Sequence, residues 1–226
     1  DLFLNDRNQL NLLSFVRHWS AEHDGRVGVM DSSPLSQTFN RDDTDRNRSA
    51  FFSAFYRHLF RVPGGELSME LNYYRFGAQN HSVLEDKDSG KSYEKMLDPS
   101  RHSLETRIDI LLPLQGGMKL ETGAEVLSED QSDDNQPSFR YRHWVSSGYA
   151  SLSLTNGDWD LRGGIRMEYD RSIFPGGSKQ LLSVLPSLKM KFSISDQQHI
   201  RLSVDRSLDR PHLYQLNPTK NPLDPY

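Results

Sequence analysis

Three acidic or amide side chains in one short motif have the spacing of a calcium-binding loop. Asp43, Asp45 and Asn47 occupy alternate positions, as the first oxygen ligands of such a loop do. The loop also needs a glycine at its sharp turn and a glutamate at its end, but this sequence has Arg48 and Ala54 there. We therefore predict that the motif is solvated chain and does not bind calcium.

A second motif has the spacing of a serine nucleophile with an activating lysine. Ser92 and Lys95 are three positions apart, but they lie in a polar segment without the companion motifs of that chemistry. Runs of acidic residues are usually solvated, and we interpret one cluster in this way: Glu129, Asp130, Asp133 and Asp134.

Other signatures of catalysis and metal binding are missing from the sequence. The 8 histidines are scattered and never adopt the His-Glu-x-x-His spacing of a zinc site. There is no glycine-rich phosphate loop and no glycine-flanked serine, and the absence of cysteine excludes disulfides and thiolate chemistry. We predict that the protein is not an enzyme and has no catalytic residue, cofactor or metal site.

The composition excludes two further classes of protein. The formal net charge is -4, with 27 basic and 31 acidic residues spread along the chain, so the basic stripe of a nucleic-acid-binding protein is absent. No apolar run approaches the ~20 residues of a membrane-spanning helix. The chain begins at Asp1 without a signal segment, which favours a processed chain or a fragment.

Strict alternation of apolar and polar residues dominates the sequence from Ala50 onward. In 159–170 the odd positions are apolar or glycine and the even positions are mostly charged, the pattern of a strand with two different faces. Segments 66–73, 118–126, 188–194 and 200–205 repeat it. In 139–155 the apolar positions change from odd to even, which predicts a β-bulge near Trp144–Gly148.

The connections alternate between short and long. Tight turns are predicted at 62–65, 115–117, 156–158 and 195–198. Longer polar loops are predicted at 31–48, 77–100, 129–138 and 172–180. The strands between them are about 10–14 residues long, which is close to what a tilted strand needs to cross a bilayer.

A soluble β-sandwich and a membrane barrel both explain the alternation. Long strands, alternating loop lengths and charges of both signs on the polar face favour the barrel, with the charged face lining a lumen. The predicted lumen residues are Glu105, Arg107, Asp109, Lys119, Glu121, Glu125, Arg162, Arg166, Glu168, Lys189, Lys191, Arg201 and Asp205. The pattern predicts an all-β fold, an antiparallel meander of roughly ten long strands, and leaves both the barrel and the sandwich open.

Two stretches, "SGYASLSLTNGDWDLRGGIRMEYDRS" and "LLSVLPSLKMKFSISDQQHIRLSVDRSLDRPHLYQLNP", resemble the outer-membrane β-barrel domain of TonB-dependent receptor-like proteins of the Bacteroidetes type. The resemblance covers residues 100–226 well and the rest only by pattern. The positions that match the family's motifs are Ala150, Trp159, Gly164, Arg166, Glu168, Tyr169, Pro186, Ser187, Arg210, Pro211, Leu216, Asn217 and Pro218.

The resemblance implies that the meander forms part of a transmembrane β-barrel wall, an incomplete barrel, in the outer membrane of a Gram-negative bacterium. It implies a receptor that imports a ligand, with membrane lipid, a small ligand, oligosaccharide or peptide, and a TonB energy-coupling complex as partners. The coupling would act through a plug domain absent from this sequence. Two alternatives stay open: a non-transporting scaffold or adhesion barrel, and a soluble β-sandwich binding module.

The expected organisation is one partial barrel domain over residues 1–226. A hairpin of 9–19 with 25–31 and a loop are expected in 1–48, followed by a regular strand meander in 49–210. Regular strand pairing is expected to end near Pro211, because it cannot donate to a sheet ladder and biases Arg210 toward an extended backbone. The resemblance implies that residues 211–226 begin a long loop.

Overall fold

The computed structural model describes residues 2–29, 37–135, 139–195 and 197–209. These residues form one antiparallel sheet of 11 strands and no helix. The strands are β1 (Leu2–Asn5), β2 (Asn8–Val29), β3 (Gln37–Leu59), β4 (Glu66–Asp86), β5 (Ser92–Leu97), β6 (Pro99–Pro113), β7 (Met118–Asp133), β8 (Arg140–Asn156), β9 (Trp159–Phe174), β10 (Gly177–Ser195) and β11 (Gln198–Asp205).

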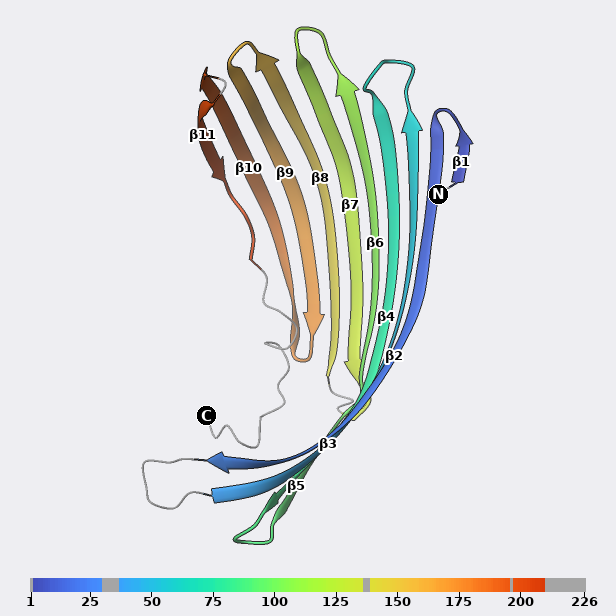
Figure 1. Ribbon diagram of the computed structural model, residues 1–226, viewed down its shortest axis with the longest axis vertical. Coiled ribbons are helices and arrows are strands. Elements are labelled where there is room, and N and C mark those ends of the chain that lie inside the picture. The colour runs from blue at the N-terminus through green and yellow to red at the C-terminus, as the bar shows by residue number, and fades with distance from the viewer. Residues whose placement is uncertain (1, 30–36, 136–138, 196, 210–226) are drawn as a thin grey trace.

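The strands lie side by side in sequence order, apart from β5, which pairs with the far end of β4. Figure 1 shows a single curved layer with the turns β1–β2, β3–β4, β6–β7, β8–β9 and β10–β11 at one end. At the β6–β7 turn, Gly116 and Gly117 have φ values of 73° and 75°, a backbone conformation that favours glycine. The predicted all-β meander is confirmed.

The segments that the sequence predicted as long polar loops are mostly strand. β4 runs through to Asp86, β7 runs to Asp133, and only residues 175–176 separate β9 from β10. The loop prediction for 77–100, 129–138 and 172–180 is therefore wrong in extent. The reason is that backbone pairing between strands continues beyond the apolar segment. The polar side chains there belong to strand residues in contact with water, and they do not indicate a loop.

The first 48 residues also differ from the prediction. The segments 9–19 and 25–31 do not pair with each other, because β2 is one continuous strand of 22 residues. It pairs with β3 without a register shift from Asn8 opposite His58 to Val29 opposite Gln37. The polar segment 37–48 belongs to β3 and is not a loop.

The predicted bulge near Trp144–Gly148 does not occur. β8 keeps a constant register with both β7 and β9. The outward positions are apolar at Ala150, Leu152 and Leu154, and polar at Arg140 and Arg142, along one unbroken alternation. The change of phase in the sequence therefore marks the level at which β8 leaves the apolar surroundings.

An apolar belt covers one face of the sheet. On β9 its outward residues include Trp159, Ile165, Met167 and Tyr169, with exposed fractions of 42%, 49%, 51% and 37%. The ten residue steps from Trp159 to Tyr169 rise about 33 Å along the strand. A tilt of about 40° reduces this to about 25 Å, the height of the apolar band of a membrane barrel.

Candidate functional site

The face opposite the apolar belt is the charged one, and it is more enclosed. Cross-strand pairing places Arg166 opposite Tyr149, Tyr149 opposite Gly123, and Gly123 opposite Asp109, so these residues share one face. All the lumen residues predicted from the sequence lie at positions of this face. We call it the inner face and the belt side the outer face.

Arg166 on β9 joins two carboxylates at the centre of the inner face. Its Nη1 and Nη2 atoms each donate to Glu125 Oε2 at 3.2 Å, and its Nε donates to Glu168 Oε2 at 3.2 Å. Glu168 is only 4% exposed. A charge buried to this degree depends on its paired arginine, so this trio fixes the relative positions of β7 and β9.

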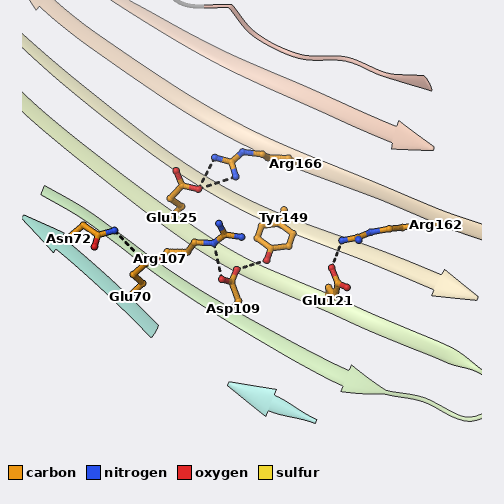
Figure 2. Close-up of polar contacts among 9 residues, drawn as sticks. All are labelled: Glu70, Asn72, Arg107, Asp109, Glu121, Glu125, Tyr149, Arg162 and Arg166. Atoms are coloured by element: carbon orange, nitrogen blue, oxygen red, sulfur yellow. Dashed lines mark hydrogen bonds and ion pairs between the residues drawn. The ribbon is translucent and has the colours of Figure 1, made fainter. Parts of the chain in front are cut away.

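A second inner-face cluster joins β6 to β8 across β7. Arg107 Nε lies 2.8 Å from Asp109 Oδ2, and the Tyr149 hydroxyl donates to Asp109. Figure 2 shows the Tyr149 ring lying between the two clusters, beside a further pair in which Arg162 donates to Glu121. The inner face therefore carries paired charges on β6, β7 and β9, and the Tyr149 hydroxyl of β8 donates to one of these carboxylates.

Gly123 makes room for the Tyr149 ring. A Cβ atom at this position would lie 2.5 Å from the Ile108 carbonyl oxygen, 2.6 Å from Asp109 Oδ1 and 2.7 Å from Tyr149 Cε1. Contacts this short force neighbours to move. The ring can reach Asp109 on the next strand but one only because the intervening residue has no side chain.

Gly123→Ala is expected to destabilise the full-length protein by about 2 kcal/mol, because overpacking displaces the Tyr149 ring and its hydrogen bond. Gly163→Ala is the matched control, since its Cβ would meet nothing within 4 Å. Urea unfolding in lipid vesicles measures both. A Gly123→Ala midpoint equal to that of Gly163→Ala would contradict the packing argument.

A third cluster lies on the inner face, toward the end of the sheet that is opposite the β6–β7 and β8–β9 turns. His143 on β8 has Nε2 3.1 Å from Asp170 Oδ2 and Nδ1 3.7 Å from Glu129 Oε2. Arg101 on β6 donates to the other oxygen of Glu129, and Ser103 Oγ donates to it at 3.5 Å. Four strands thus contribute to one group, which we call the rim cluster.

The sequence did not predict the rim cluster. Its residues lie on four strands, and Glu129 was interpreted as a solvated loop charge. The alternation of side chains along each strand could have revealed it. If the strands are extended past the apolar belt with the same alternation, Arg101, Glu129 and His143 all fall on the polar face.

The family comparison covers most of the chain. Residues 58–226 match the model of the outer membrane protein beta-barrel family. The chain belongs to this family. It is therefore a wall segment of an outer membrane barrel from a Gram-negative bacterium, and it is not an enzyme. The alternative of a soluble β-sandwich is wrong.

Solved structures agree with an outer membrane barrel at the level of fold. The structure of the FpvAI–pyocin S2 complex matches with a TM-score of 0.59 and 12% identity, over 88% of this chain and 37% of the other. The Pseudomonas aeruginosa protein FpvA bound to heterologous pyoverdines matches with a TM-score of 0.58 and 12% identity, over 86% of this chain and 35% of the other. The chain thus spans little more than a third of those structures.

No curated protein matches the sequence. Among the described residues, no helix is long and apolar enough to cross a membrane.

Barrels of this kind have short periplasmic turns and longer extracellular extensions, which orients the outer membrane barrel. On this basis we assign the end with the β6–β7 and β8–β9 turns to the periplasm, because the β2–β3 and β4–β6 connections at the opposite end are longer. The rim cluster is then extracellular, because His143, Glu129 and Asp170 lie beyond the belt segments 144–154, 118–126 and 159–169.

The rim cluster has unusual protonation. The pKa of His143 is raised from 6.5 because its ring faces the carboxylates of Glu129 and Asp170. The pKa of Glu129 is lowered because His143 and Arg101 stabilise its charged form. His143, which is 8% exposed, therefore contributes most to stability as an imidazolium.

A raised histidine pKa stabilises the folded state fully below pH 6.5, and this contribution is lost as the pH rises through the raised value. NMR titration of histidine-labelled full-length protein in micelles should give a His143 midpoint above 6.5. Asp170→Asn should lower that midpoint, and His143→Gln assigns the signal. A midpoint that Asp170→Asn leaves unchanged would contradict the assignment of Asp170 as a partner.

The family-motif residues inside the described ranges occupy both faces. Trp159 and Tyr169 lie on the outer face, where the Trp159 and Phe192 rings are 4.5 Å apart. Gly164, Arg166 and Glu168 lie on the inner face; a Cβ at Gly164 would approach the Ser151 Cβ to 2.9 Å. A structural role of these residues in the barrel wall stays a prediction.

Pro186 lies on the outer face of β10, opposite Ile165. Its carbonyl oxygen accepts from the Arg206 backbone N–H at 3.1 Å. In an antiparallel strand the N and C=O of one residue point to the same neighbour, so the missing N–H of Pro186 faces the side where β11 ends. The proline therefore costs no β9–β10 hydrogen bond.

The predicted motif residues Arg210, Pro211, Leu216, Asn217 and Pro218 lie outside the described residues, as does the predicted loop 211–226.

The calcium-loop-like motif and the Ser-x-x-Lys motif do not form sites in the folded chain. Asp43, Asp45 and Asn47 lie along one strand and cannot wrap around a cation as a loop does. Ser92 and Lys95 point to opposite faces of β5. Within the ranges that the structure describes, no group of three or more histidine, aspartate or glutamate residues has an arrangement that could hold a metal ion.

Proposed function

We propose that the full-length protein is a TonB-dependent receptor that binds a ligand at its extracellular end and imports it across the outer membrane. The rim cluster carries the proposal, because it places a histidine, an arginine and two carboxylates on the inner face above the apolar belt. A rigid barrel with polar groups at its mouth is a typical site for recognition.

The solved structures support the proposal only through the fold. The FpvA structures are described as bound to heterologous pyoverdines and, for FpvAI, as a complex with pyocin S2; these words apply to those proteins, and they suggest which ligands to test first. Ferric siderophores are therefore a reasonable first set of probes. Energy coupling requires a plug domain, which would have to come from another part of the protein.

The test uses a deletion strain complemented with the full-length gene. Uptake of radiolabelled iron from hydroxamate and catecholate siderophores is measured with and without a proton uncoupler. We expect uptake of at least one chelate to require the gene and to stop with the uncoupler. If deletion does not change the uptake of any ligand tested, including cobalamin, oligosaccharides and peptides, the protein is instead a non-transporting scaffold.

A further inference from the structure

Five cationic side chains gather on the inner face toward its periplasmic end. They come from β7, β9, β10 and β11, close to the β6–β7, β8–β9 and β10–β11 turns, and strand pairing places them on the same face as Arg166. We call them the inner basic patch: Lys119, Arg162, Lys189, Lys191 and Arg201. On the opposite face, Leu188 and Ile200 are 52% and 56% exposed. The patch therefore faces the barrel interior and not the lipid.

Two pairs of like charges lie directly opposite each other within the patch. Lys189 of β10 lies opposite Arg162 of β9. Two residues farther along β10, Lys191 lies opposite Arg201 of β11. Residues directly opposite in an antiparallel sheet have Cβ atoms about 5 Å apart, and like charges at such positions destabilise the sheet. An anion bound among these four cations would remove that repulsion.

Carboxylates of the wall neutralise only part of this positive charge. Figure 2 shows Arg162 donating to Glu121, and Lys191 Nζ lies 3.7 Å from Asp160 Oδ2. Asp205 of β11 is the third carboxylate at this level of the inner face. Five cations and three carboxylates leave this part of the inner face with a net charge of +2.

Three cations of the patch lack a carboxylate partner. Lys119, Lys189 and Arg201 are exposed and make no ion pair with any residue in the parts of the chain that the structure describes. Nearer the centre of the same face, Arg166 meets two carboxylates. The wall therefore satisfies its central arginine by itself, whereas the patch leaves positive charge available to an anion in the lumen.

We propose that the inner basic patch binds a multivalent anion, and that the imported ligand is an anion held at this patch before it enters the periplasm. This inference rests on the proposed import function and adds the charge of the ligand. Lysine and arginine side chains that line a pore select anions. Arginine also offers paired, charge-assisted hydrogen bonds to a carboxylate or phosphate group. The occupant is a small ligand and not a lipid, because the apolar belt lies on the other face.

The test is a calorimetric titration of the full-length protein in detergent with citrate, a small multivalent anion. Lys189→Gln/Arg201→Gln should weaken citrate binding by at least about tenfold, because two charge-assisted contacts are lost. Triethyl citrate, which is uncharged, should bind the unaltered protein about as weakly as citrate binds the variant. Raising the ionic strength should weaken citrate binding to the unaltered protein.

The matched control is Lys179→Gln/Arg206→Gln, which also removes one exposed lysine and one exposed arginine. Lys179 lies near the extracellular end of β10, and Arg206 directly follows β11. The control should leave citrate binding unchanged, and heat-modifiable gel migration checks that both variants fold. Equal affinity of Lys189→Gln/Arg201→Gln and the unaltered protein for citrate would overturn the proposal, and an acidic segment of the protein that already occupies the patch would give this result.

Citrate binding does not depend on transport, so the import function and the anion site can fail separately. If deletion of the gene leaves all uptake unchanged but Lys189→Gln/Arg201→Gln still weakens citrate binding, import is rejected and the anion site is supported. In the complemented strain, this variant should lower uptake of an anionic ferric triscatecholate severalfold. Uptake of an uncharged ferric trishydroxamate alone would overturn the inference that the imported ligand is an anion.

Discussion

Replacing Arg166 by methionine is expected to destabilise the full-length barrel by about 3 kcal/mol, because it removes the arginine that pairs with a buried carboxylate. Glu168 is 4% exposed, and Arg166 supplies hydrogen bonds to both Glu168 and Glu125. The loss should appear as a lower midpoint in urea unfolding from lipid vesicles, with an unchanged slope.

Two further variants separate charge from packing. Arg166→Met/Glu125→Gln/Glu168→Gln should recover much of the lost stability, since neutral groups no longer require a partner cation. Arg166→Lys should be intermediate, because lysine keeps the charge but loses the fork that reaches two carboxylates. An Arg166→Met midpoint equal to that of the unaltered protein would mean that water or other parts of the barrel already solvate Glu168.

Alternation in the sequence was sufficient to predict which charged residues lie on the inner face, but not which of them pair with one another. Arg162, Arg166 and Glu168 were placed on the polar face correctly, because the side-chain period of a strand is strictly two. Which carboxylate each arginine meets depends on register between strands. Register is set by long backbone ladders, and a single sequence does not reveal it.

The extent of the strands was underpredicted for a related reason. Polar residues in 77–86 and 129–133 were interpreted as loop, although backbone hydrogen bonding continues through them. Outside the membrane, polarity reports contact with water and not the end of a strand. The same reasoning explains the false bulge in β8, where the outward residues become polar as they leave the belt.

The two faces of β8 and β9 therefore have different surroundings at two levels of the barrel, within the belt and above it. Within the belt, the outer face meets lipid and the inner face carries the paired charges of Glu121, Glu125 and their arginines. Above the belt, the inner face carries the rim cluster, where we place ligand contact. On the outer face at that level, Arg140 and Arg142 of β8 both pair with Asp130 of β7.

Replacing Ile165 by arginine is expected to cost about 2–4 kcal/mol, the penalty for a cation at the midplane of a barrel's lipid face. Ile165 is 49% exposed on the outer face and lies near the middle of the belt segment from Trp159 to Tyr169. Its cross-strand neighbours Ala150 and Pro186 offer no carboxylate. Urea unfolding from lipid vesicles measures the loss.

The control for the lipid-face assignment is an arginine substitution on the same face at a different depth in the membrane. Ile173→Arg changes the same residue type on the same face of β9, but beyond the belt, beside Arg142. It should cost at most about 1 kcal/mol, as expected near an interface. Ile165→Val should cost about 1 kcal/mol as well, because it removes only one methylene. Equal losses for the two arginine variants would place the midplane of the membrane elsewhere along β9 and contradict the belt from Trp159 to Tyr169.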